Sequence, residues 1–236
     1  MARPAHGTAP AHRRPYPGDG DRGEPHRGPR RSGARRGGVG APRAGTGDEG
    51  SRDDLRAACR ACDAGAAEDE LLAALQSAKA PLLLALDGVQ DPHNLGACLR
   101  SADACGALAV IVPRDRAAQL TPSARKVAVG AAETTPVVSV TNLARTLKLL
   151  KEAGLWVVGA DVAAAKRADE VDLAGPVALA LGAEGSGLRH LTRQNCDFLV
   201  GLPHLGAVES LNVSVAAGML LYEAVRQRQG QSRSTL

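Results

Sequence analysis

The chain has 236 residues, of which 44% are hydrophobic and 2% aromatic, so it can build a core but not an RNA-binding face of several stacking aromatics. It contains no apolar run near the roughly 18 residues that a membrane span needs, and its N-terminus lacks the apolar stretch of a secretory signal. These features predict a soluble, cytoplasmic protein without a membrane partner.

The excess positive charge lies at the N-terminus. Residues 1–50 hold 10 Arg and 5 acidic residues, whereas residues 51–236 hold 19 basic and 20 acidic residues. Residues 1–50 also contain 12 Gly, 7 Pro and, in Val39, a single Val, Ile or Leu, so they cannot bury enough apolar surface to offset their ordering entropy. We predict that residues 1–65 form a disordered Arg/Gly/Pro-rich segment. It could contact RNA phosphates, be a solvated extension without function, or reflect a misread frame over a lost RNA-binding domain.

Residues 66–80 are predicted to form a linker helix, because Leu71, Leu72 and Leu75 recur at helical spacing. From residue 81, apolar runs typical of buried strands alternate with helix-like segments. This alternation predicts an α/β domain over residues 81–229, with a mostly parallel sheet covered by helices on both faces, and a tail at 230–236. The strand-like runs are 82–86, 108–112, 137–140, 156–160, 177–181 and 198–202, and the helix-like segments lie near 93–105, 121–129, 142–153, 187–195 and 210–228.

Three polar segments directly follow predicted strands. The first, residues 87–96 (DGVQDPHNLG), starts a helix that continues to Arg100. The second, residues 181–188 (LGAEGSGL), is rich in glycine but lacks the pattern of a phosphate-binding loop. The third, residues 202–215 (LPHLGAVESLNVSV), leads into the C-terminal helix. Because ligands bind at the carboxyl ends of parallel strands, the three segments are candidates for one site.

Each polar residue in these segments also has a purely structural interpretation. Arg100 could form an exposed pair with Asp103, and Asn94 could merely start a helix. Ser210 and Asn212 could merely cap the C-terminal helix, and the glycine-rich segment could be a plain turn. Only the expected convergence of the three segments favours a functional interpretation.

The five cysteines do not predict a metal site. Cys59 and Cys62 form one Cys-x-x-Cys pair, but a zinc site needs four ligands and normally a second pair. We interpret the cysteines as small, reduced, apolar residues and expect no bound metal.

Over roughly residues 68–229, the sequence resembles the SpoU/TrmH family of RNA ribose 2′-O-methyltransferases in the SPOUT superfamily. Within the family, the stretch DPHNLGACLRSADACG is most similar to bacterial members that methylate one guanosine ribose of large-subunit ribosomal RNA. The motifs that carry the resemblance are Asn94-Leu95-Gly96 through Arg100, residues 179–185 (LALGAEG), and Leu202-Pro203 with Ser210-Leu211-Asn212-Val213-Ser214.

The resemblance implies a C-terminal trefoil knot that holds S-adenosyl-L-methionine, and a homodimer with its active site near the interface. It implies methyl transfer to a guanosine 2′-hydroxyl of large-subunit ribosomal RNA, which would be the substrate and partner. Residues 1–65 do not resemble the small RNA-binding domain of such relatives. The residues implied to be catalytic are Arg100, Asn94, Glu184, Ser210 and Asn212, and those implied to bind the cofactor are Gly182, Leu202 and Leu211.

Other functions stay open at this point. The chain could methylate a guanosine of transfer RNA, or be a non-catalytic RNA-binding or assembly factor. A dinucleotide-binding oxidoreductase is disfavoured, because no glycine-rich fingerprint follows the first predicted strand. In the C-terminal helix, an apolar stripe either contributes to the dimer interface or covers the subunit's own sheet. The stripe consists of Leu211, Val215, Met219 and Tyr222.

Overall fold

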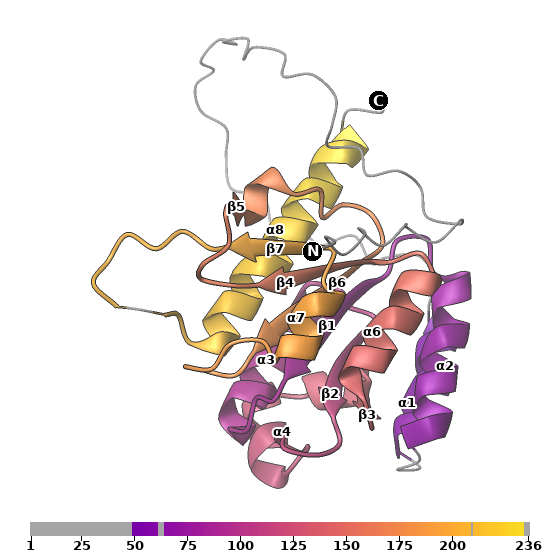
Figure 1. Cartoon of the computed structure of the whole chain (residues 1–236). Helices are drawn as coiled ribbons and strands as arrows, with labels where there is room; N and C mark the ends of the chain where they lie inside the picture. Colours follow the sequence, from indigo (N-terminus) through magenta and orange to yellow (C-terminus); the bar gives the residue numbers. More distant parts are fainter. Residues whose placement is uncertain (1–48, 61–63, 209, 234–236) are drawn as a thin grey trace, which may run out of the picture.

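The computed structural model describes residues 49–60, 64–208 and 210–233, which form a sheet between two layers of helices (Figure 1). In this part of the chain, seven strands lie in the order β3-β2-β1-β6-β4-β7-β5, and all pairs of neighbouring strands are parallel. The strands are β1 (Leu82–Asp87), β2 (Ala109–Pro113), β3 (Val137–Val140), β4 (Trp156–Ala160), β5 (Lys166–Arg167), β6 (Val177–Gly182) and β7 (Phe198–Gly201).

The predicted α/β class with a mostly parallel sheet is confirmed, and each of the six predicted strands is present. Strand β5 was not predicted, because its two residues are charged and exposed and join the sheet edge only by pairing with β7. The trefoil knot stays a prediction.

The helices are α1 (Glu49–Arg60), α2 (Ala64–Ser77), α3 (Pro92–Ala104), α4 (Pro122–Ala128), α5 (Ala131–Thr134), α6 (Leu143–Glu152), α7 (His190–Asn195) and α8 (Val213–Arg233).

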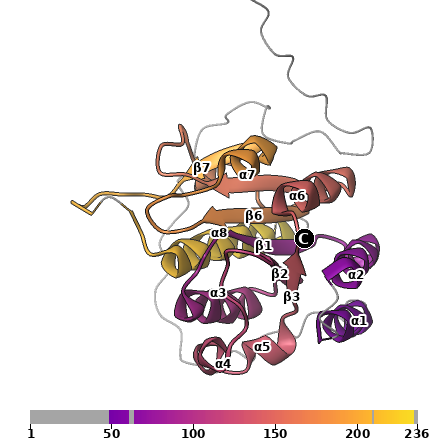
Figure 2. The same cartoon turned by 60° about the horizontal axis from the view of Figure 1, so that its bottom comes forward.

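Alternate residues of the buried strands point to opposite faces of the sheet, which gives the domain two apolar clusters. In β1, Leu84 and Leu86 belong to the cluster with α3 and α8, whereas Leu83 and Ala85 belong to the cluster with α2 and α6. Figure 2 shows α3, α4 and α8 apart from α1, α2 and α6, with the strands between them. Both faces are thus covered, as the continuous apolar runs predict.

The structure corrects the predicted limits of order at both ends. Helix α1 lies inside the segment predicted to be disordered, and its Leu55 is fully buried in the cluster that also contains Leu71 of α2. The average composition of residues 1–65 concealed this apolar packing, to which Ala58 and Cys59 of α1 also contribute. Residues 1–48 lie outside the described part of the chain. At the other end, α8 continues to Arg233, into the predicted tail.

Among the helices described, none combines the length and the apolar character that crossing a bilayer requires.

Candidate functional site

The three polar segments meet at the carboxyl edge of the sheet, as their positions after strands predict. Asn94 Nδ2 donates to Glu184 Oε1 at 3.1 Å, and Asn212 Nδ2 donates to the same oxygen at 2.7 Å. Asn212 Nδ2 also lies 3.0 Å from Asn94 Oδ1. We call Asn94, Glu184 and Asn212 the amide–carboxylate cluster. One residue from each segment is therefore tied to the other two.

Asn94 owes its place to the way α3 starts. Asp91 is the N-cap residue, and its carboxylate accepts a hydrogen bond from His93 N at 2.9 Å. Pro92 occupies the first turn, where a missing N–H costs nothing. This start, which the sequence predicts, directs Asn94 towards Glu184.

Asn212 caps α8 and also belongs to the cluster. Its Oδ1 accepts hydrogen bonds from Ser214 N at 2.9 Å and Ser214 Oγ at 2.6 Å, while its Nδ2 faces Glu184. The capping interpretation of Asn212 is thus confirmed, and its catalytic role stays a prediction. Ser210 is not the cap, because α8 begins at Val213.

The glycine-rich loop, residues 183–188, needs its glycines for geometric reasons. Gly185 and Gly187 have φ angles of +77° and +64°, which side-chain-bearing residues rarely adopt. A Cβ atom on Gly182 would lie 1.9 Å from the carbonyl carbon of Gly187. The loop folds back tightly on the end of β6, with Gly187 N donating to Ala183 O at 2.9 Å.

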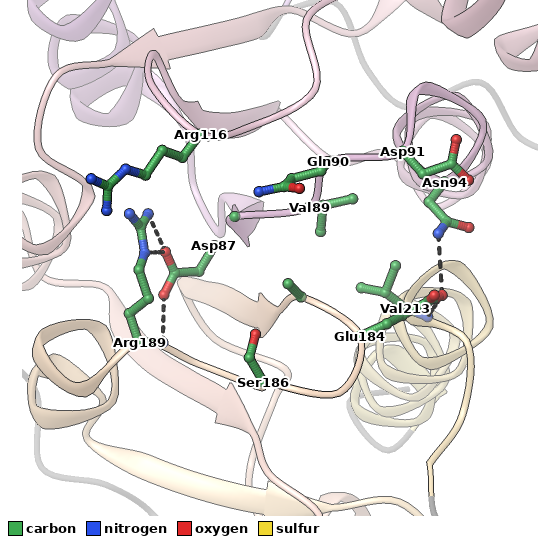
Figure 3. Close-up of a pocket in the computed structure, with 12 residues that line it drawn as sticks. Asp87, Val89, Gln90, Asp91, Asn94, Arg116, Glu184, Ser186, Arg189 and Val213 are labelled. Atoms are coloured by element: carbon green, nitrogen blue, oxygen red, sulfur yellow. Dashed lines mark hydrogen bonds and ion pairs between the residues drawn. The ribbon is translucent and has the colours of Figure 1, made fainter.

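An ion pair between a buried carboxylate and a half-exposed arginine, which we did not predict, anchors the far end of this loop. Asp87, the last residue of β1, is 1% exposed. Its Oδ2 accepts from Arg189 N at 2.8 Å, and its Oδ1 accepts from Arg189 Nε at 2.5 Å (Figure 3). One feature of the sequence could have indicated this pair: Asp87 ends an otherwise apolar strand. A carboxylate buried there needs a hydrogen-bonding or charged partner.

A pocket of about 480 Å³ lies beyond the carboxyl ends of β6 and β7, and we call it the β6–β7 pocket. The structure brings the three predicted cofactor residues together there, since Gly182, Leu202 and Leu211 all line it. Ser210 lines it as well, outside the amide–carboxylate cluster. Its volume lies in the range of about 300–1,000 Å³ typical of small-molecule sites.

Arg100, like Ser210, is a predicted catalytic residue that the structure does not bring to the cluster, and Arg100 lines neither of the pockets beside the cluster. Its side chain is exposed on α3 and makes no hydrogen bond or ion pair with the other described residues. The alternative pair with Asp103 is wrong, because that carboxylate instead accepts from Thr134 Oγ1 at 2.5 Å and Thr135 Oγ1 at 3.1 Å. Arg100 follows Asn94 by six residues, about 240° around the helix, so it points away from the cluster.

The apolar stripe of α8 faces away from the subunit's own sheet. Val215, Met219 and Tyr222 are 50%, 37% and 65% exposed. The interpretation that the stripe covers the sheet is therefore wrong. The residues of α8 that do so are Val213, Ala217, Leu220, Leu221 and Ala224.

In the described residues, no group of three or more His, Cys, Asp or Glu side chains is arranged to hold a metal ion. Cys62, one half of the Cys-x-x-Cys pair, lies outside this part of the chain.

Comparison with known proteins gives the family. Residues 81–222, which contain all the predicted site residues, match the SpoU rRNA Methylase family. The chain belongs to this family.

Curated relatives match over most of the same domain. A 149-residue stretch is 64% identical to the 23S rRNA (guanosine-2′-O-)-methyltransferase RlmB of Pseudomonas putida and covers 63% of this chain and 60% of that protein. The protein of the same name from Pseudomonas syringae pv. tomato is 61% identical over 165 residues, or 70% of this chain and 65% of that protein. The chain thus spans less than two thirds of the length of these relatives.

Solved structures share the fold. The SpoU methyltransferase AviRb from Streptomyces viridochromogenes, in complex with AdoMet, has a TM-score of 0.61 and 31% identity, with 65% of this chain and 62% of that chain covered. A TrmH/SpoU tRNA-modifying enzyme from A. aeolicus has a TM-score of 0.60 and 27% identity, with 70% of this chain and 86% of that chain covered.

Proposed function

We propose that this chain transfers a methyl group from S-adenosyl-L-methionine to the ribose 2′-hydroxyl of a guanosine in large-subunit ribosomal RNA. The observation that carries the proposal is the meeting of Asn94, Glu184 and Asn212 at the wall of a pocket lined by Gly182 and Leu211. The curated relatives are named for this reaction, and a cytoplasmic location follows from a ribosomal RNA substrate.

The β6–β7 pocket has the chemistry that the cofactor requires. Leu181, Leu188, Leu202 and Leu211 supply apolar surface for the adenine ring. The bends after β6 and β7 present backbone N–H and C=O groups to its polar edges. When bound, S-adenosyl-L-methionine supplies a methyl group activated by its positive sulfur.

The ribose 2′-hydroxyl is a weak nucleophile, so its proton must leave as the new bond forms. Glu184 Oε1 already accepts from Asn94 and Asn212, with Val213 N at 3.4 Å, so its role is to hold the loops in register. Asn94 and Ser210 orient the ribose or Arg100. An arginine keeps its proton and offers a bidentate fork, so Arg100 stabilises the developing alkoxide and fixes the adjacent phosphate, which accepts the proton.

A homodimer through the α8 stripe resolves the separation of Arg100 from the cluster. A Cβ on Gly218 would lie 3.7 Å from Ser101 Oγ, so α3 packs beside the N-terminal third of α8 and Arg100 stands level with Gly218. Asn212 lies at the start of α8, about 9 Å away along its axis. Two α8 helices that cross antiparallel near Val215 about a two-fold axis place Asn212 of each beside Gly218 of the other. Arg100 of one protomer then reaches the cluster of its partner.

The test of the reaction is methyl transfer from labelled cofactor to large-subunit ribosomal RNA, with 2′-O-methylguanosine identified by nuclease digestion and mass spectrometry. Transfer RNA serves as the competing substrate.

Arg100→Ala should reduce single-turnover methylation by about 10²-fold, the scale of one lost transition-state donor, and Arg100→Lys should not rescue it. The control is Arg145→Ala on α6, on the face of the sheet opposite α3. This arginine is 68% exposed and pairs with Glu68 at 3.6 Å, so its loss should leave methylation unchanged. Methylation of transfer RNA alone would refute the ribosomal substrate, and a wild-type rate for Arg100→Ala would refute the role of Arg100.

The test of the dimer is subunit complementation. Arg100→Ala and Asn212→Ala should each lose nearly all activity, but a re-paired mixture should recover about a quarter of wild-type activity, because half of the dimers contain one intact site. If both residues act within one protomer, the mixture stays inactive.

A further inference from the structure

A second pocket of about 430 Å³ lies on the other side of the glycine-rich loop, beyond the carboxyl end of β1, and we call it the β1 pocket. It shares Ala183, Glu184, Ser186 and Val213 with the β6–β7 pocket, so the loop is the wall between the two. The amide–carboxylate cluster stands at one end of the β1 pocket, where Asn94 and Glu184 line it (Figure 3). A ligand in this pocket would therefore lie next to the proposed reaction centre.

The two arginines of the β1 pocket differ in how their charges are compensated. Arg189 is 48% exposed and held by the buried carboxylate of Asp87. Arg116 is exposed and makes no hydrogen bond or ion pair with the other described residues. Arg116 comes from the loop after β2 and lies across the pocket from Glu184, with Gln90 between them (Figure 3). The pocket thus contains one uncompensated cation, at the end opposite the cluster.

The backbone of Arg116 is held in an unusual conformation. Its φ angle is +56°, a left-handed value that a residue with a side chain seldom adopts. The loop around it packs on the segment after β1, since Ala118 N donates to Val89 O at 2.7 Å. Strained residues of this kind occur preferentially at functional sites, where the surrounding structure maintains them.

We infer that the β1 pocket receives the guanine base of the nucleotide to be methylated, and that the Arg116 guanidinium donates to its O6 and N7 atoms. The inference rests on the proposed function, because the cluster must then lie at the ribose. A nucleoside along the pocket has its ribose at Asn94 and Glu184 and its base at Arg116. Guanine presents two acceptors at O6 and N7, which a guanidinium fork matches, whereas adenine presents an amino donor in place of O6. Arg116 therefore selects guanosine over adenosine, provided that the base is unpaired and turned out of its helix.

The experiment compares Arg116→Asn with Arg114→Asn in the full chain. Asparagine tolerates the left-handed conformation, so the loop keeps its shape at position 116. Arg114 is a matched control, because it is exposed in the same loop but lines a different pocket. Single-turnover methylation is measured with RNAs that carry guanosine, adenosine or 7-deazaguanosine at the target position. Cofactor affinity and melting temperature are measured for each variant.

Arg116→Asn should slow methylation of guanosine about ten- to a hundredfold, the range of one bidentate arginine–guanine pair, and narrow the preference over adenosine by the same factor. The 7-deazaguanosine substrate, which lacks the N7 acceptor, should slow the wild-type chain but have little further effect on Arg116→Asn. Cofactor affinity should not change, and Arg114→Asn should behave as the wild type.

Two results would overturn the assignment while leaving the proposed function intact. One is a wild-type guanosine preference in Arg116→Asn. The other is an equal loss in Arg114→Asn, which would indicate general attraction of RNA phosphates. If the wild-type chain transfers no methyl group to RNA, the proposed function is wrong and the pocket assignment falls with it.

Discussion

Substitution of Gly182 by alanine should disrupt the glycine-rich loop and abolish cofactor binding. The added Cβ would lie 1.9 Å from the Gly187 carbonyl carbon, 2.0 Å from the Gly187 oxygen and 2.2 Å from Leu188 N. All three are backbone atoms, so no side-chain rotation can relieve the overlap. To restore carbon–carbon contact at about 3.5 Å, the loop must move by roughly 1.5 Å.

The magnitude follows from what the loop is tied to. Leu188 precedes Arg189, whose N–H donates to Asp87 Oδ2 at 2.8 Å. A displaced loop leaves that fully buried carboxylate short of a donor, which costs about 1–3 kcal/mol. Overpacking at Gly182 adds about 1–3 kcal/mol. The total of about 2–6 kcal/mol corresponds to a fall in melting temperature of roughly 4–24 °C for a domain of this size.

Gly201→Ala is the matched control, because Gly201 ends the parallel strand β7 beside the same pocket. Its Cβ would meet nothing closer than Ala164 O at 3.6 Å, an ordinary contact. Thermal unfolding and calorimetric titration with S-adenosyl-L-methionine should show a stable, binding-competent Gly201→Ala and a destabilised, non-binding Gly182→Ala. A Gly182→Ala variant with wild-type melting temperature and affinity would refute the loop geometry.

Three further predictions concern stability. Gly96→Ala should lower the melting temperature, because the added Cβ would lie 2.5 Å from Ala124 O. The resulting overpacking costs about 1–3 kcal/mol, which outweighs the gain in helix propensity of about 1 kcal/mol. Gly218→Ala should raise the melting temperature, because the added Cβ would meet no atom closer than 3.7 Å. Equal changes in the melting temperatures of the two variants would contradict this reasoning. Val129→Gly should stabilise the protein by about 1 kcal/mol, because Val129 has a left-handed φ of +50° and its side chain is 67% exposed, so little packing is lost. Thermal melts test this, and a lower melting temperature would disprove backbone strain at Val129. Burial raises the pKa of Cys98 from 9.0 to about 12, so above pH 9.0 the unfolded chain releases this proton while the folded chain keeps it. The free energy of unfolding, measured by denaturant titration, should therefore fall as the pH rises above 9.0. Cys98→Ala should make this fall shallower. An unchanged dependence of the free energy of unfolding on pH in Cys98→Ala would exclude a contribution from this thiol.

Local chemistry explains what could be predicted from the sequence. The apolar runs around Leu84 and Leu179 can be satisfied only by burial on both faces of a sheet, so they predict its strands. Asp91 and Pro92 specify the start of α3 through backbone hydrogen bonding within one turn. Because all three polar segments follow strands of a parallel sheet, they are expected at one edge of it, and the pairing of β1 with β6 then brings Asn94 to Glu184.

Other features depend on contacts between distant segments, which no local pattern encodes. Asp87 and Arg189 are 102 residues apart, and each has an ordinary local environment until β1 and the glycine-rich loop lie side by side. The direction of the α8 stripe was ambiguous for a similar reason. Helical periodicity places Val215 and Tyr222 on one face, but the packing of Ala217 and Leu221 against the sheet decides that this face points outward.

The sequence by itself determined the fold class and six of the seven described strands, because these depend on periodicity and order along the chain. The residues of the amide–carboxylate cluster were singled out by the resemblance to the family and not by periodicity. Only the tertiary structure decided that Arg100 points away from that cluster and that Arg116 enters the β1 pocket. A side chain's direction depends on the rotation of its helix or loop against its neighbours, and that rotation is set by packing across the whole domain.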